Sequence, residues 1–112
     1  MDIYTTIAET TTAWDVRLIT IAHVTDTYLA AHAAGEIRPR KGVSLGGAIA
    51  NVVLQAAAMI ETELGAEPTV EEMRELAVEM CEKVDNPVNG ERATKLDNYF
   101  RDGMSLDYGR TI

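Results

Sequence analysis

An uncharged segment of nineteen residues, 42–60, dominates the pattern of polar and apolar positions in this chain. Its apolar residues lie almost all round a helical wheel, which predicts a helix over about 44–64 that is buried on most sides. Ser44 suits the N-cap of this helix and Gly65 suits its end. The run is long enough to cross a membrane, but its glycines, alanines and polar residues favour insertion only weakly. We therefore expect the central helix of a soluble bundle and no membrane partner.

The N-terminal segment, about 2–34, has the period of an amphipathic helix. Its apolar face keeps its phase through Thr10, Thr11 and Thr12, so we expect one long helix that bends there. The competing signal is Asp15, three residues after Thr12, because this spacing resembles a capping box and would start a second helix.

Two further helices are predicted in the second half of the chain. Thr69 and Glu72 have the spacing of a capping box and begin a helix over 70–85. A second amphipathic segment follows at 91–103, and residues 104–112 read as a tail. Four helices with short connections and no convincing strand predict a single all-α domain, 1–112, folded as a compact four-helix bundle.

Composition limits how such a bundle is stabilised. The chain has 112 residues, 46% hydrophobic, with one Trp and one Phe. The core must therefore consist mainly of small aliphatic side chains and methionines, each of which buries little area. A domain of this size gains stability when it oligomerises, so we expect a homodimer. Cys81 is the single cysteine, which excludes an internal disulfide and fits a reducing cytoplasm.

The net charge of −8 is concentrated in the second half of the chain. Residues 1–60 carry five acidic and four basic residues, whereas residues 61–112 carry thirteen acidic and six basic residues. Nonspecific nucleic-acid binding depends on clustered lysine and arginine, so the distribution argues against it and favours a protein partner with a basic surface. The partner-binding residues are expected on the polar side of the 70–85 helix: Glu71, Glu72, Glu75, Glu79 and Glu82. Some small acidic helical inhibitors, including phage-encoded ones, cover nucleic-acid-binding surfaces in this way, which is an analogy of class.

The 70–85 helix also holds two short carboxylate patterns, E-E-x-x-E from Glu71 to Glu75 and E-x-x-D from Glu82 to Asp85. Together they resemble the metal-binding signature of the all-α, MazG-like nucleotide pyrophosphohydrolases. The resemblance implies carboxylates that hold Mg²⁺, which binds the substrate phosphates and activates water. In that family the second pattern comes from the following helix, whereas here both lie on one helix. On this alternative the ligands to test are Glu71, Glu72, Glu75 and Asp97.

A basic loop precedes the uncharged helix, and a pair of glycines lies in the first turn of that helix. Free N–H groups and the positive end of a helix attract phosphate, which gives a third hypothesis, a regulator that binds a phosphate ligand. The order of residues fits neither a Walker motif nor a dinucleotide fingerprint. We favour instead close packing of helices at the glycines. The anion-binding candidates are Arg38, Arg40, Lys41, Gly46 and Gly47.

No convergent catalytic set is found in the sequence. His23 and Asp26 are one helical turn apart, but no nucleophile is identifiable beside them, so an exposed histidine is the simpler interpretation. His32 falls on the apolar face, and Cys81 is expected to be a small buried hydrophobe with an unreactive thiol. We therefore expect a non-enzymatic interaction protein without a cofactor.

Overall fold

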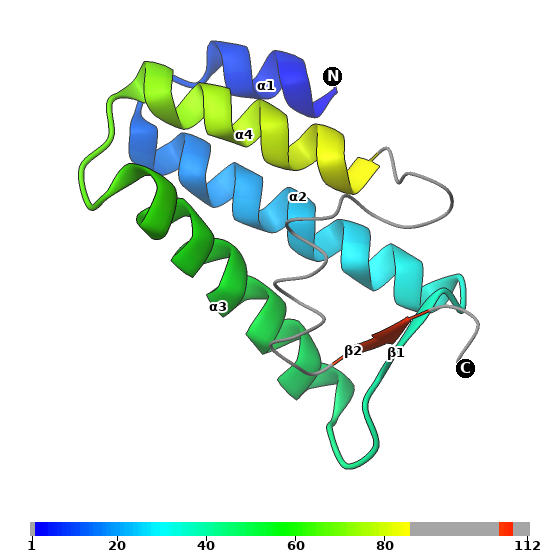
Figure 1. Ribbon diagram of the computed structural model, residues 1–112. Coiled ribbons are helices and arrows are strands. Elements are labelled where there is room, and N and C mark those ends of the chain that lie inside the picture. The colour runs from blue at the N-terminus through cyan, green and yellow to red at the C-terminus, as the bar shows by residue number, and fades with distance from the viewer. Residues whose placement is uncertain (1, 86–105, 109–112) are drawn as a thin grey trace.

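The computed structural model describes residues 2–85 and 106–108, which form four helices and a two-stranded antiparallel sheet (Figure 1). The elements in chain order are α1 Ile3–Glu9, α2 Ala13–Ala33, β1 Ile37–Pro39, α3 Leu45–Leu64, α4 Val70–Asp85 and β2 Leu106–Tyr108. The helices pack against each other, so the predicted all-α bundle of four helices is confirmed. The helix predicted over 91–103 lies outside the described residues.

The four described helices differ from the predicted four at the N-terminus, where the single helix over 2–34 is wrong. The hydroxyl of Thr12 accepts a hydrogen bond from the N–H of Asp15 at 3.1 Å and caps the start of α2. α1 ends at Thr10, whose backbone is extended while its N–H still bonds the carbonyls of Thr6 and Ile7. The cap at Thr12 therefore decides the break. The predicted apolar face does not continue through it, because Trp14, Leu18 and Leu29 are exposed while the buried residues of α2 begin at Val16.

α2 is the central helix of the fold, with α4 packed along one flank and α3 along the other (Figure 1). α1 packs mainly against α4. Tyr28 of α2 is the largest fully buried side chain, and the remaining core consists mostly of aliphatic residues and methionines. The small-residue core predicted from the composition is therefore observed in the described part of the chain.

Trp14 lies outside this core. A helical wheel places it on the apolar face of the N-terminal segment, but its side chain is 63% exposed.

α3 begins and ends at the predicted residues. The hydroxyl of Ser44 accepts from the N–H of Gly47 at 3.0 Å, and Gly65 ends the helix with φ of 77°. Enclosure on most sides is not observed, however, because only one side of α3 is buried and Leu54 is 63% exposed. α3 contacts α2 along its length but touches α4 little. By length and composition alone α3 is able to span a membrane, a test that core helices of soluble proteins also pass.

The described residues also contain a small sheet that the sequence does not predict. β1 and β2 pair antiparallel, with Ile37 opposite Tyr108 and Pro39 opposite Leu106. β1 follows the turn after α2, and the side chain of Ile37 is buried. Residues 106–108, which the sequence places in a tail, are therefore held against the link between α2 and α3.

Candidate functional site

The glutamates of α4 form an acidic face directed away from the core. The buried residues of this helix, from Met73 to Val84, lie along one stripe. At 100° per residue the opposite side carries glutamates at successive turns. All five are exposed: Glu71, Glu72, Glu75, Glu79 and Glu82. The structure thus places the predicted partner-binding residues together on one solvent-facing side of α4, which we call the acidic face.

Glu72 has a structural role within the acidic face. Its Oε1 accepts a hydrogen bond from the N–H of Thr69 at 3.0 Å, and the hydroxyl of Thr69 accepts from the N–H of Glu72 at 3.1 Å. These two bonds are the reciprocal pair of a capping box, as the spacing predicts. The backbone bond from Thr69, followed by the side-chain bond from the same residue, lowers the pKa of Glu72. This carboxylate starts α4 and is the member of the face least suited to mutation in a binding test.

The two basic residues of α4 are both engaged. Lys83 Nζ lies 2.9 Å from Glu79 Oε1, one turn away on the same helix. Arg74 Nη2 donates to the carbonyl of Thr10 at 2.6 Å, and so ties α4 to the break between α1 and α2. The guanidinium group of Arg74 therefore serves the packing of the bundle. Glu71 and Glu75 remain as a pair of exposed like charges one turn apart, a spacing that is mildly destabilising in a helix.

The alternative metal-binding set is not assembled by the described residues. Glu71, Glu72 and Glu75 lie on the exposed side of one helix, and no second helix faces them with carboxylates in the described part of the chain. Among residues 2–85 and 106–108, no group of three His, Cys, Asp or Glu side chains is placed to hold a metal ion. Asp97 lies outside the described residues. The resemblance to the pyrophosphohydrolases therefore gains no support from the geometry.

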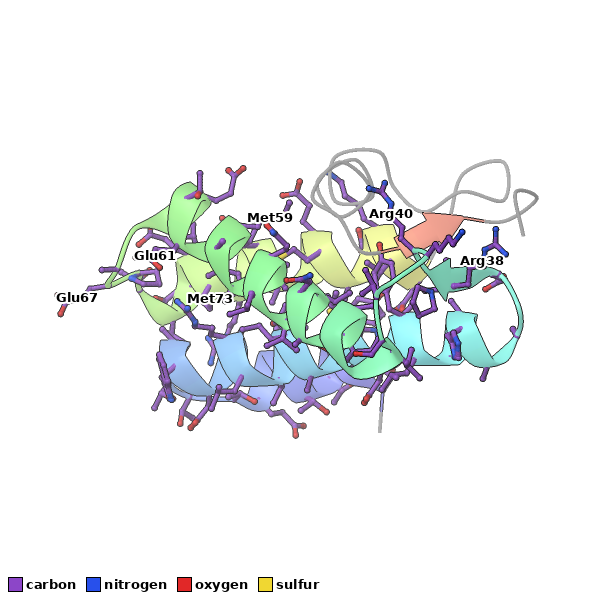
Figure 2. All side chains as sticks on the ribbon, turned by 90° about the horizontal axis from the view of Figure 1, so that it is seen from below. Arg38, Arg40, Met59, Glu61, Glu67 and Met73 are labelled. Carbon is purple, nitrogen blue, oxygen red and sulfur yellow. The ribbon has the colours of Figure 1, made fainter. Side chains whose placement is uncertain are left out.

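The basic loop and the glycine pair lie at the end of the molecule that carries the sheet. Figure 2 shows Arg38 and Arg40 there, on and just after β1. Lys41, Gly46 and Gly47 are exposed. The N–H of Gly47 already donates to Ser44, so the cap occupies one of the donors that an anion would need. Among the described residues the favoured packing of helices is not seen at either glycine, because a Cβ built on Gly46 would meet nothing within 4 Å and one on Gly47 would meet only the adjoining Ser44 and Val43.

A Tyr–Asp–His cluster, which the sequence does not predict, joins three helices. Asp85 Oδ1 lies 2.8 Å from His23 Nε2, and the hydroxyl of Tyr4 donates to Asp85 Oδ2 at 2.9 Å. The side chains of His23 and Asp85 are 25% and 28% exposed, so the cluster lies at the rim of the bundle. Burial raises the pKa of Tyr4 well above its ordinary value, and the bond to Asp85 adds to the effect. The exposed histidine expected from the sequence is therefore wrong, because His23 is half-buried and paired with Asp85, while Asp26, one turn away, is exposed.

This cluster is suited to holding helices together. It connects α1, α2 and α4 through one carboxylate at the end of α4.

The neighbouring thiol of Cys81 is fully buried, as predicted. Burial raises its pKa to about 12, so the thiol is a poor nucleophile at neutral pH.

Removing the carboxylate of Asp85 tests the role of the cluster. We expect Asp85→Ala to lower the free energy of unfolding by about 1–3 kcal/mol, because Tyr4 and His23 both lose their partner. Urea denaturation followed by circular dichroism measures the change. Asp26→Ala is the matched control, and we expect it to change stability by less than about 0.5 kcal/mol. Equal losses in the two variants would show that the cluster contributes nothing beyond a surface charge.

No family model, curated protein or solved structure matches this chain. Of the arrangements described above, the acidic face is the one that offers several exposed groups of one chemical kind on a rigid element.

Proposed function

We propose that this protein is a non-enzymatic binding protein whose acidic face docks on a basic surface of another protein. The observation that carries the proposal is the run of exposed carboxylates on α4, directly opposite its buried stripe. Because the opposite side of α4 is packed against the core, the helix holds these carboxylates at fixed spacing. This lowers the conformational entropy lost on binding.

The electrostatics of the acidic face support a basic partner. Glu71 and Glu75 lie one helical turn apart, and such a like-charge pair costs about 0.2–0.5 kcal/mol in the free helix, whereas Lys83 already offsets the charge of Glu79. Lysine or arginine side chains of a partner would relieve this repulsion and form charge-assisted hydrogen bonds. Long-range attraction between the negative chain and a basic partner would also speed their encounter.

A surface that binds nucleic acid is the kind of partner that fits best. Such surfaces carry clustered lysine and arginine at phosphate spacing, and a row of carboxylates on one helix would compete for the same side chains. The proposed role is therefore that of an inhibitor or cover for a basic surface, in the manner of the small acidic helical inhibitors.

Charge reversal on the acidic face is the direct test. We expect Glu71→Lys/Glu75→Lys to weaken binding of a fluorescein-labelled peptide of alternating lysine and alanine by at least about tenfold at moderate ionic strength. Fluorescence anisotropy gives the dissociation constant. Glu72 is left unchanged because it caps α4.

The matched control has the same change in net charge at other exposed sites. Glu9→Lys/Asp26→Lys places two reversals on α1 and α2, and we expect it to weaken binding by less than about threefold. If both double variants weaken binding equally, only the net charge matters and the acidic face is not a docking site. If the acidic face is the docking site, the natural partner should be captured from cell extract by the wild type and by Glu9→Lys/Asp26→Lys, but not by Glu71→Lys/Glu75→Lys.

A further inference from the structure

The exposed large apolar side chains of the described residues belong to two neighbouring helices. Three lie on α2 and three on α3, while α1 and α4 carry none. They are Trp14, Leu18, Leu29, Leu45, Val53 and Leu54. Val53 and Leu54 are neighbours on α3, and adjacent large apolar side chains left exposed on a helix point to an interaction site.

The outer side of α3 has the spacing of a helix–helix interface. Gly46, Ala50, Val53 and Ala57 follow one another at intervals of three and four residues and therefore share one side of the helix. The first three are exposed, as is the adjacent Leu54, and no charge interrupts the helix before Glu61. We call this side of α3 the apolar face. Small residues along such a row allow a second helix to approach closely.

Gly46 is not required by any contact within the described structure. A Cβ at this position would meet nothing within 4 Å, and the φ of Gly46 is not in the positive region that favours glycine. Glycine inside a helix costs about 1 kcal/mol relative to alanine. Its presence is explained if the close approach comes from outside the chain.

The charges at the two ends of α3 determine what approaches. Figure 2 shows Glu61 and Glu67 at one end of the helix and the basic loop at the other. Lys41 precedes the N-terminus and Glu61 lies in the last turn, so each charge has the sign that its own helix dipole disfavours. A second α3 running antiparallel would bring the partner's Glu61 to the positive end and reverse both effects.

We propose that the apolar face of α3 is the interface of a symmetric homodimer in which the two α3 helices run antiparallel. A two-fold axis beside Val53 and Leu54 places Val53 against the partner's Leu54 and Ala50 against the partner's Ala57. The same register brings the partner's Glu61 to Gly46, in the first turn of α3, where the N–H of Gly47 is already held by Ser44 but the positive end of the helix dipole attracts a carboxylate. Lys41 lies in the loop just before this turn and carries the opposite charge.

This occupant also fits the dimensions. α3 has 20 residues and is about 30 Å long, and a standard interface takes about 800 Å² from each partner. The acidic face of α4 does not take part, so this inference stands apart from the proposed function.

Analytical ultracentrifugation at protein concentrations of about 1–100 µM tests the dimer. We expect the wild type to sediment with twice the mass of the chain, and Leu54→Glu to weaken dimerisation by at least about 30-fold. Ala8→Glu, which adds the same charge at an exposed position of α1, is the matched control and should leave the dimer intact. Circular dichroism checks that both variants keep their helices, because Leu54 and Ala8 are exposed in the single chain.

The antiparallel arrangement has a separate signature. Lys41→Glu and Glu61→Lys should each weaken the dimer by about three- to tenfold. The double variant Lys41→Glu/Glu61→Lys should dimerise more tightly than either single variant, because the charge pair is restored, but less tightly than the wild type, because a lysine cannot accept from N–H groups at the helix end. If the double variant dimerised as weakly as the effects of the two single variants added together predict, the antiparallel register would be overturned. A wild type that is monomeric over the whole concentration range, or that cosediments with phosphatidylcholine vesicles instead, would overturn the dimer.

Discussion

Tyr28→Ala is expected to lower the free energy of unfolding by about 3–5 kcal/mol, the largest loss of any substitution considered for this chain. Tyr28 is fully buried and is the largest such side chain in the described structure. It belongs to α2, which packs against both α4 and α3. Alanine at this position would leave a cavity, because the close-packed neighbours relax only partly into the space that the ring occupied.

The measurement is urea denaturation of the wild type and the variant under the same conditions. A small domain has about 5–15 kcal/mol of stability in total, so a loss of this size moves the midpoint far enough to be measured directly. Asp26→Ala, two residues away on the exposed side of α2, is the control for substitution on the same helix. If Tyr28→Ala cost less than about 1 kcal/mol, Tyr28 would not be at the centre of the core.

The parts of the fold that local chemistry determines are the parts that the sequence predicts. Ser44 and Gly65 bound α3, and the box of Thr69 and Glu72 begins α4, each through bonds between residues three or four apart. The exposure of the glutamates on α4 follows from the same periodicity. Such features need no knowledge of the rest of the chain, since a helix cap and a helical stripe involve only neighbouring turns.

The features that the sequence does not predict depend on residues far apart in the chain. The partner of His23 is Asp85, 62 positions away, although Asp26 lies one turn away on the same helix. The pairing of β1 with β2 likewise joins two short segments that carry no strand pattern of their own. Periodicity also fails at Thr10 to Thr12, because the apolar face that a helical wheel selects across the break includes Trp14 and Leu18, which are exposed in α2.

The candidate site divides in the same way. The spacing of the glutamates on α4 is enough to predict that they share one side of the helix. The spacing does not predict their different roles, because Glu72 caps α4 while Glu79 pairs with Lys83. The sequence also could not show that one side of α3 is exposed in the described structure, since the apolar positions of this nearly uncharged helix lie almost all round the wheel.

Stability is expected to fall steeply in alkaline solution because of Cys81. Burial, followed by the negative charge of Asp85, raises the pKa of this thiol from 9.0 to about 12. Below pH 9 the thiol is protonated in the folded and unfolded states, and the full stability is present. Above pH 9 the unfolded chain loses this proton while the folded chain keeps it, so the free energy of unfolding falls by about 1.4 kcal/mol per pH unit. The loss continues as the pH rises towards the folded pKa.

Urea denaturation of the wild type and Cys81→Ala at a series of pH values from about 8 to 11 isolates this contribution. For each protein the loss in free energy of unfolding between pH 8 and pH 11 is measured. We expect this loss to be about 3 kcal/mol larger in the wild type than in Cys81→Ala. Tyr4 acts in the same direction, because its pKa is also raised in the fold, and Tyr4→Phe separates its share. Lysine deprotonation affects all three proteins alike and cancels in the comparison. Parallel pH profiles for the wild type and Cys81→Ala would mean that the thiol is accessible to water, and rapid reaction with iodoacetamide in the folded state would show the same.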